Sequence, residues 1–240
     1  MKDNLTDLVK HTVDLGTVSV IKVEGTTKKT SIEGVADDRS VIIQGTFLDP
    51  IDEFKGTFGM PNLNILRTLL SIEEYQEDAK ITVKQDKAKG PVSMNFKNAA
   101  GDFTNDYRFM VKDVVDDQLK SVKFKGANWD VEIEPTVASI NRLKMQATAN
   151  AEEATFTMKT DGTDLVIYFG DHSSHAGNFV FATDVSGELK KGWHWPVGHI
   201  IGILSLDGDK TFKVSDDGAT EIIVNSGLAE YTYILPAQTK

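Results

Sequence analysis

Two clusters of chemically versatile side chains lie in the second half of the chain. Residues 171–175 read DHSSH, and two imidazoles with a carboxylate are groups that bind transition metals. This segment falls between two predicted strands, so we favour a solvated hairpin turn over a metal site. His194 stands between Trp193 and Trp195 and could be a buried base. Strand alternation instead predicts an exposed position for it, opposite the two indoles.

Other motifs of catalysis are missing from the sequence. The Asp-Gly pairs at 161–162, 207–208 and 217–218 are typical of turns and lack the ligand spacing of a calcium loop. Neither G-x-S-x-G, G-x-x-x-x-G-K-[ST] nor G-x-G-x-x-G occurs. We therefore predict that the protein is not an enzyme and uses no metal or cofactor. Detection of bound metal in the purified protein would reopen the enzymatic hypothesis.

The composition excludes further classes. The 240 residues include no cysteine, which rules out disulfides, thiolate nucleophiles, zinc ribbons and iron–sulfur clusters. Lys and Arg total 26 against 36 Asp and Glu, a formal charge of −10. A uniformly basic nucleic-acid coat is excluded, whereas a basic lining inside an acidic shell is allowed. No apolar run approaches the roughly 18 residues of a membrane helix, and the start lacks an apolar signal core. We expect a soluble, cytoplasmic protein.

Short alternating segments predict strands over most of the chain. In the first half they are 18–25, 28–35, 40–47, 53–60, 80–86, 91–97 and 106–112. In the second half they are 128–134, 154–162, 164–171, 177–184, 210–217, 220–226 and 229–236.

Four segments with helical spacing interrupt the strands: residues 3–15 and the stretches that follow Pro61, Pro135 and Pro196. Proline suits a first helical turn because its missing N–H has no partner there. The residues expected on the inward faces are Leu5, Leu8, Val9 and Thr12, then Leu63, Leu66 and Leu70, then Val137, Ile140 and Leu143, and last Ile200, Ile201 and Leu204.

The order of these elements indicates an internal duplication. Placing 58–61 over 193–196 aligns Ile65 with Ile200, Leu66 with Ile201 and Leu69 with Leu204. We predict a first domain over 1–110, a connecting segment over 111–126 and a second domain over 127–240. Val114, Val115, Leu119 and Val122 are the apolar points of the connecting segment. It is either a solvated connection or an exposed strap on which a partner docks.

In size and order of elements the chain resembles DNA sliding clamps, the polymerase processivity factors. It is similar to the two-domain subunits of proliferating cell nuclear antigen and most like T-even-type bacteriophage clamps. The local resemblance is carried by DDRSVIIQGTFL (37–48), DVVDDQLKSV (113–122) and AEYTYILPAQ (229–238). It implies an α+β fold with two similar clamp domains, antiparallel sheets outside and two helices per domain lining a ring.

The resemblance also implies a function. Subunits of this family close head-to-tail into a ring, here a homotrimer, which leaves no sheet edge exposed. The ring encircles double-stranded DNA without sequence preference and tethers a DNA polymerase after a clamp loader has placed it. Such a protein has no catalytic residues and acts in the cytoplasm, that of the host if a phage encodes it.

The resemblance and the charge pattern imply three sets of site residues. The candidate DNA-facing residues are Lys10, Arg67, Arg142 and Lys144, with partial charge from His11 and His199. The stretch 197–206 has no Lys or Arg, which departs from the family pattern. The expected pocket for a partner peptide is formed by Val41, Ile43, Leu119, Ile234, Leu235 and Pro236. The expected subunit interface joins 107–111, with Tyr107, Phe109 and Val111, to the neighbour's 178–184, with Phe179, Val180 and Phe181.

One alternative shares the acidic charge and the strands. It is a β-rich viral structural or scaffolding protein that does not encircle DNA. A ring with a hole wide enough for duplex DNA favours the clamp, whereas a compact monomer or a helical polymer favours the alternative.

Overall fold

The computed structural model describes residues 1–86, 90–119, 124–171 and 175–238. Contacts within the chain divide it into two compact units. The first unit contains residues 1–123 together with the return segment 225–231, and the second contains 124–224 and 232–240. Among the described residues, the helices are too short or too polar to cross a membrane. The domain limits expected from the sequence stay a prediction.

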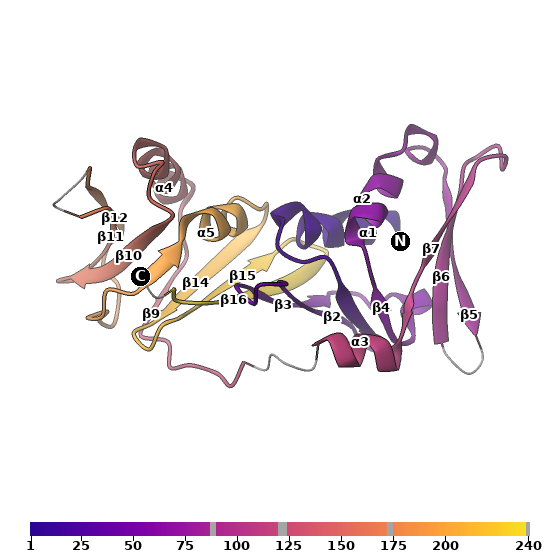
Figure 1. The fold of residues 1–240 in the computed structure, drawn as a ribbon, viewed down its shortest axis with the longest axis horizontal. Coiled ribbons are helices and arrows are strands. Elements are labelled where there is room, and N and C mark those ends of the chain that lie inside the picture. The colour runs from indigo at the N-terminus through magenta and orange to yellow at the C-terminus, as the bar shows by residue number, and fades with distance from the viewer. Residues whose placement is uncertain (87–89, 120–123, 172–174, 239–240) are drawn as a thin grey trace. The chain divides into compact units, whose positions relative to one another are not determined.

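The first unit contains three α-helices, eight strands and three short 3₁₀ turns in the described residues (Figure 1). The helices are α1 (Lys2–Lys10), α2 (Leu63–Ser71) and α3 (Lys112–Leu119), and the 3₁₀ turns are η1 (Val13–Leu15), η2 (Asp52–Phe54) and η3 (Glu73–Tyr75). The strands are β1 (Ile21–Gly25), β2 (Thr30–Val35), β3 (Ile42–Phe47), β4 (Gly56–Met60), β5 (Lys80–Asp86), β6 (Gly90–Lys97), β7 (Thr104–Arg108) and β8 (Met110–Val111).

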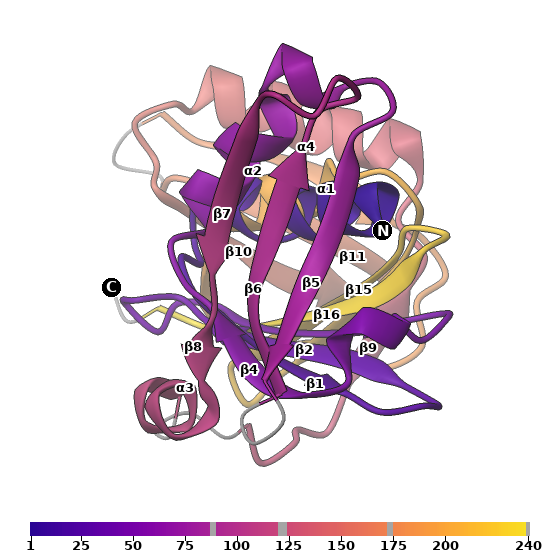
Figure 2. The same ribbon diagram turned by 90° about the vertical axis from the view of Figure 1, so that its right-hand side faces the viewer.

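These strands form two antiparallel arrays. One has the order β8-β4-β1-β2-β3, and the other has the order β5-β6-β7. Helices α1 and α2 pack together on one face of the β5-β6-β7 sheet (Figures 1 and 2). Alternation fixes the inward faces: Met94 and Phe96 of β6 and Leu63 and Leu66 of α2 are fully buried. Burial of such side chains is the main source of folding free energy.

The return segment completes the core beside α1. Tyr231 stacks on the His11 ring, with centroids 4.2 Å apart and planes 3° apart. Its hydroxyl donates to Asp7 Oδ2 at 2.8 Å, and the Ser226 hydroxyl donates to the same oxygen at 2.9 Å. The side chain of Asp7, on α1, is therefore satisfied by residues more than 200 positions away in the sequence.

The second unit repeats the order of strands and helices. Its helices are α4 (Val137–Ala149) and α5 (Val197–Leu204). Its strands are β9 (Val131–Ile133), β10 (Thr155–Asp161), β11 (Asp164–Phe169), β12 (Gly177–Ala182), β13 (His194–Pro196), β14 (Asp209–Ser215), β15 (Ala219–Asn225) and β16 (Ala229–Pro236). The sheet orders are β12-β11-β10-β13 and β16-β15-β14-β9, and α4 packs on both α5 and β12.

The helices differ from their sequence-based predictions in three details. The helix expected over 3–15 ends at Lys10, because the Thr12 hydroxyl bonds to the Leu8 carbonyl and the chain turns into η1. Val137 is 76% exposed, whereas Leu143 is fully buried. Six residues place these two positions about 120° apart around a helix, so they cannot share one face.

The third difference concerns the alignment of the two halves. Buried residues are Leu66, Leu69 and Leu70 in α2 and Ile200, Ile203 and Leu204 in α5. Within the helices the alignment is therefore shifted by one position from the one inferred for the strands. The three prolines expected in first turns also precede their helices: Asn62 and Thr136 are the N-caps of α2 and α4, and Pro196 is itself the N-cap of α5.

Candidate functional site

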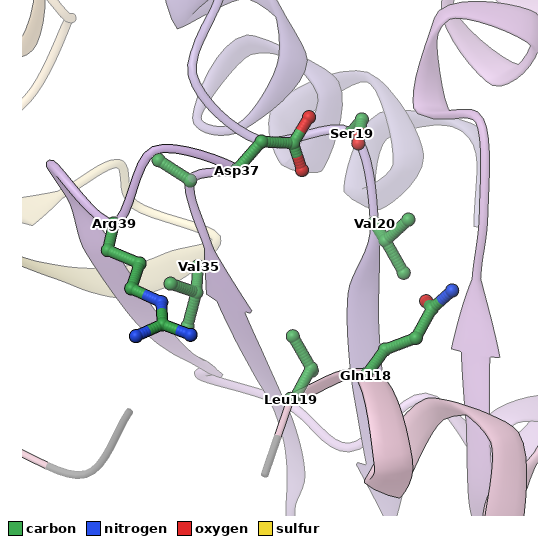
Figure 3. Close-up of a pocket in the computed structure, with 8 residues that line it drawn as sticks. Ser19, Val20, Val35, Asp37, Arg39, Gln118 and Leu119 are labelled. Atoms are coloured by element: carbon green, nitrogen blue, oxygen red, sulfur yellow. The ribbon is translucent and has the colours of Figure 1, made fainter. Parts of the chain in front are cut away.

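A pocket of about 400 Å³ opens in the first unit between the end of α3 and the strands beside it. Its lining comes from the approach to β1, the turn after β2 and the last two residues of α3: Ser19, Val20, Val35, Ala36, Asp37, Arg39, Gln118 and Leu119. Figure 3 shows the side chains of Val20, Val35 and Leu119 around one space, with Arg39 and Gln118 on opposite sides of it. The lining is thus half aliphatic and half polar or charged.

Helix α3 is seated on the strands through a single buried valine. Val115 is fully buried, and it lies against Gly59 of β4. A Cβ at Gly59 would stand 2.8 Å from the Val115 Cβ and 3.0 Å from the Met110 Cβ, which is closer than side chains tolerate. Glycine at this position is what lets the helix approach the strand closely.

Ion pairs hold the same helix from its polar side. Lys22 Nζ, on β1, lies 2.8 Å from Asp116 Oδ1 and 2.6 Å from Glu24 Oε1. Lys112 Nζ donates to the other carboxylate oxygen of Asp116. The hydrogen bonds from Lys112 and then Lys22 lower the pKa of Asp116 to about 2. The hydrogen bonds with Asp116 and then Glu24 raise the pKa of Lys22 to about 12.

The turn on the other side of the pocket is fixed by its own backbone. The Ala36 N–H donates to the Val41 carbonyl at 2.9 Å, and the Arg39 N–H donates to the Ala36 carbonyl at 2.8 Å. Arg39 has φ +61°, a left-handed conformation that tight turns require. Asp38 Oδ1 accepts the Ser40 N–H at 2.9 Å. The turn therefore presents Asp37 and Arg39 from a defined scaffold.

The structure places the residues of the predicted peptide pocket in different environments. Leu119 is half-buried and lines the pocket just described. Val41 and Ile43 are fully buried and are not among its lining residues. Ile234 and Leu235 are buried and Pro236 is exposed, all on the part of β16 that belongs to the second unit. As one site, this set stays a prediction. Residues 120–123 of the connecting segment, with Val122, lie outside the described residues.

The four basic residues predicted to face DNA are all exposed on helices. Lys10 is the last residue of α1, Arg67 lies on α2, and Arg142 and Lys144 lie on α4. Arg67 Nη1 is 3.5 Å from Asp14 Oδ1, a pair open to solvent on both sides. Exposed pairs of this kind are worth little, so Arg67 can exchange its partner for a phosphate.

The histidines behave differently from the expectation. His11 is only 2% exposed, and its Nδ1 lies 2.9 Å from the Asp7 carbonyl oxygen, so it adds no accessible charge. His199 is half-buried on α5. His194 is also half-buried, although alternation predicted exposure. Of the DHSSH segment, residues 172–174 lie outside the described part of the chain. Within the described part, no three His, Asp or Glu side chains are grouped as a metal site.

The two segments predicted at the subunit interface include terminal strands of their sheets. β7 is last in the order β5-β6-β7, and β12 is first in β12-β11-β10-β13. Tyr107 is 3% exposed, its hydroxyl donates to the Pro61 carbonyl, and burial raises its pKa. Phe109 is half-buried against Phe58, with ring centroids 4.4 Å apart, and Val111 is 43% exposed.

On β12, Asn178 is exposed and the side chains that follow it are apolar. Phe179 and Val180 are half-buried, whereas Phe181 is 4% exposed and packs edge-on against Phe212. Tyr107 and Phe181 therefore belong to the cores of their own units. Whether these two strands pair between subunits stays a prediction.

Most of the pocket lining carries no signal in the sequence. Asp37 and Arg39 lie in the segment 37–48, which resembles the clamp family, but Ser19, Val20 and Val35 lie within segments predicted only as strands. Two features of the sequence point toward this pocket. One is the short turn between the predicted strands 28–35 and 40–47, and the other is Leu119, an isolated leucine in a polar segment.

No protein-family model and no curated protein sequence matches the chain. Solved structures do match. One, described as the C-terminal region of FEN-1 bound to A. fulgidus PCNA, has a TM-score of 0.73 at 11% identity and covers 100% of this chain and 97% of its own. Another, PCNA from Thermococcus kodakaraensis, has a TM-score of 0.68 at 10% identity and covers 99% and 97%. This likeness confirms the predicted α+β sliding-clamp fold with two domains.

Proposed function

We propose that the chain is the subunit of a DNA sliding clamp, a processivity factor that encircles double-stranded DNA and tethers the replicative polymerase. The observation that carries this proposal is the full-length likeness to PCNA, because it includes both units and both helix pairs. A clamp works by topology and performs no reaction. Its residues have to slide along DNA and hold partners, and none needs to be catalytic.

The DNA contacts of such a clamp are phosphate contacts, which are independent of sequence and exchange freely. Lys10, Arg67, Arg142 and Lys144 support this role because each is exposed on one of the helices α1, α2 and α4. Helix α5 offers no Lys or Arg. Its lack of cations departs from the nuclear clamps, and on that ground we assign the chain to the T-even-type phage clamps, acting in the host cytoplasm.

The partners are a DNA polymerase and a clamp loader, each docking a short peptide. A pocket that combines aliphatic and polar side chains suits a peptide with one aliphatic or aromatic anchor and polar flanks. The pocket that Leu119 lines supports this docking mode. The PCNA structure that binds the C-terminal region of FEN-1 is a precedent for a clamp that holds another protein's segment. Val41, Ile43 and residues 234–236 belong to the predicted socket, but of these only Pro236 is exposed to a ligand.

We propose a homotrimer closed by pairing of β7 and the following residues to 111 with β12 of the next subunit. The terminal position of both strands in their sheets supports this, because unpaired edges invite uncontrolled association. A head-to-tail interface closes into a ring when its rotation allows.

The test combines mass and topology. We expect a particle of about three times 26.4 kDa in sedimentation equilibrium. After loading, it should stay on nicked circular DNA and be lost when that DNA is linearised. Replacing Lys10, Arg67, Arg142 and Lys144 by Gln should preserve the trimer and reduce the salt slope of loading by roughly one unit per lost phosphate contact.

A matched variant neutralises four exposed lysines elsewhere, Lys28, Lys29, Lys125 and Lys190, and should load like the wild type. A monomer, an open polymer, or equal retention on circular and linear DNA contradicts the clamp. A monomer or a helical polymer would instead support the viral structural alternative.

A further inference from the structure

The β5-β6-β7 sheet of the first unit has one face turned away from the core. Cross-strand register puts nine residues on that face in three rows. The rows are Lys80–Lys97–Thr104, Thr82–Asn95–Asp106 and Lys84–Ser93–Arg108. Figure 2 shows the three strands broadside, with α1 and α2 of the same unit behind them.

The opposite face explains the outward direction of these residues, although Ser93, between Lys84 and Arg108, is only 5% exposed. Met94 and Phe96 alternate with Ser93, Asn95 and Lys97 along β6, and both apolar residues are fully buried. Side chains that alternate with a buried set stand on the other side of the pleat. The nine positions are therefore held on a sheet whose register the core fixes.

The outward face is basic, although the chain as a whole carries a formal charge of −10. Lys80, Lys84, Lys97 and Arg108 are exposed, and Asp106 is the one carboxylate among the nine residues. An excess of three positive charges thus sits on an area of roughly 10 by 13 Å, from strand spacing and rise. Such a concentration of like charge is disfavoured unless it meets an anion.

Asp106 compensates Lys84 through a hydrogen bond and Arg108 through a longer-range attraction. Its Oδ1 accepts from Lys84 Nζ at 3.0 Å and from the Asn95 amide at 3.2 Å. The hydrogen bond from Lys84, followed by that from Asn95, lowers the pKa of Asp106. In the described part of the chain no carboxylate forms a salt bridge with Lys80, Lys97 or Arg108.

We propose that this face binds the phosphate backbone of nucleic acid, as a contact separate from the basic helices. Cations interspersed with hydroxyl and amide groups are the side chains that contact phosphate oxygens, and here Thr82 and Thr104 are exposed beside them. None of the nine residues is aromatic or a large apolar residue, so the face cannot stack bases or anchor a protein hot spot. The binding is independent of sequence.

The proposal does not depend on ring closure. A flat, basic sheet face can hold a strand of either single-stranded or duplex nucleic acid that lies across it. If the protein is a clamp, the face gives it a second grip, on nucleic acid that is not encircled. If it is not a clamp, the face still binds.

The test uses a fluorescent 20-nucleotide single-stranded oligonucleotide, which requires neither loader nor ring. Titration by anisotropy at several salt concentrations compares the wild type with a variant carrying Lys80→Gln, Lys84→Gln, Lys97→Gln and Arg108→Gln. We expect at least a tenfold loss of affinity at low salt and a salt slope reduced by up to about three units, roughly 0.7 for each of the four contacts with a single strand. The Lys28, Lys29, Lys125 and Lys190 variant, with the same charge change, should stay within about threefold of the wild type.

Asp106→Asn provides the opposite change in charge and should bind the oligonucleotide more tightly than the wild type. Far-ultraviolet circular dichroism and the urea midpoint verify that each variant is folded. Equal affinity of wild type and sheet variant, or equal losses in both lysine variants, overturns the proposal. So does binding of polyglutamate through this face without binding of the oligonucleotide, which would assign it to acidic proteins.

The circular-DNA assay separates this proposal from the clamp. A sheet variant that stays on circular DNA but loses the oligonucleotide supports both. A wild type that binds the oligonucleotide through the face but is not retained on circles supports the face and contradicts the clamp.

Discussion

The two units join a strand to a helix with different numbers of residues. In the second, Trp195 pairs with Phe156, and the N–H of Val197, two residues later, donates to the Ala154 carbonyl at 3.0 Å. In the first, Met60 pairs with Ile21, and the matching donor to the Ser19 carbonyl is Leu63, three residues later.

The extra residue in the first unit is Asn62, which adopts φ +50°. Asparagine tolerates this left-handed conformation better than most residues. This single residue accommodates the extra length of the connection. Helices α2 and α5 therefore bury corresponding faces. The comparison shows that a duplicated connection can change length without changing the packing that it serves.

The segments that follow the last strand of each unit also differ: α3 follows β8, and residues 237–238 follow β16. On the strand alignment Gly59 corresponds to His194. Helix α3 lies over Gly59, whereas in the second unit the chain end bridges to His194, with the Gln238 N–H donating to the His194 carbonyl at 2.8 Å. At Gly59 the missing side chain leaves room for Val115 of α3.

The largest effect is expected from a side chain introduced at Gly59, beneath α3. Gly59→Val should destabilise the protein by about 1–3 kcal/mol, because its side chain overlaps Val115 and forces α3 or β4 to move. Urea unfolding measures this change. Gly198→Ala, on α5 with nothing within 4 Å of its Cβ, should instead stabilise by up to about 1 kcal/mol. Equal effects of the two substitutions would mean that α3 is not seated on Gly59.

A second prediction tests whether α3 or the segment around Pro236 contributes more to the binding of a partner peptide. Leu119→Ala, at the end of α3, should cost about 2 kcal/mol of binding free energy for a peptide from the C-terminus of the polymerase, or roughly thirtyfold. Val114→Ala, exposed on the same helix and outside the pocket, is the control. Pro236→Ala tests the tail. Isothermal calorimetry on the intact oligomer measures all three, and unchanged affinity for Leu119→Ala would move the socket away from α3.

The smallest effect concerns the charges that hold α3. Because the pKa of Asp116 is lowered from an ordinary 3.8 to about 2, its stabilising contribution is present above pH 4 and disappears as pH falls to 2. Asp116→Asn should therefore be less stable than the wild type at pH 5, by less than Gly59→Val. The two free energies of unfolding should converge toward pH 2, and a gap that stays constant would contradict the ion-pair assignment.

The strands were the most predictable part of the fold. The segments 80–86 and 229–236 match β5 and β16 residue for residue, because alternation of apolar and polar side chains and the flanking turn residues are local signals. Helix α3 was not predicted as a helix. Only Val115 of its eight residues is buried, so no period is visible, and docking on Gly59 together with the ion pairs to Lys22 and Lys112 stabilises it.

The candidate site was also predictable only in part, because only one of its features is a local signal. Leu119 was identifiable as an apolar residue in a polar segment. Ser19 and Val35 lie 100 and 84 positions away from it, and only the packing of α3 on the strands brings the three together. The one-residue shift between the helices was hidden because the strand alignment places Ile65, Leu66 and Leu69 on apolar residues, although it places Leu70 on Ser205.

Residues 225–231 belong to the first unit, although the residues on both sides of them belong to the second. The chain therefore cannot be cut at one point into its two units. A fragment that stops before residue 225 would leave the Asp7 carboxylate without its Ser226 and Tyr231 donors and the His11 ring without its stacking partner. A cut between the two units in the connecting segment would therefore separate the first unit from seven of its own residues, 225–231.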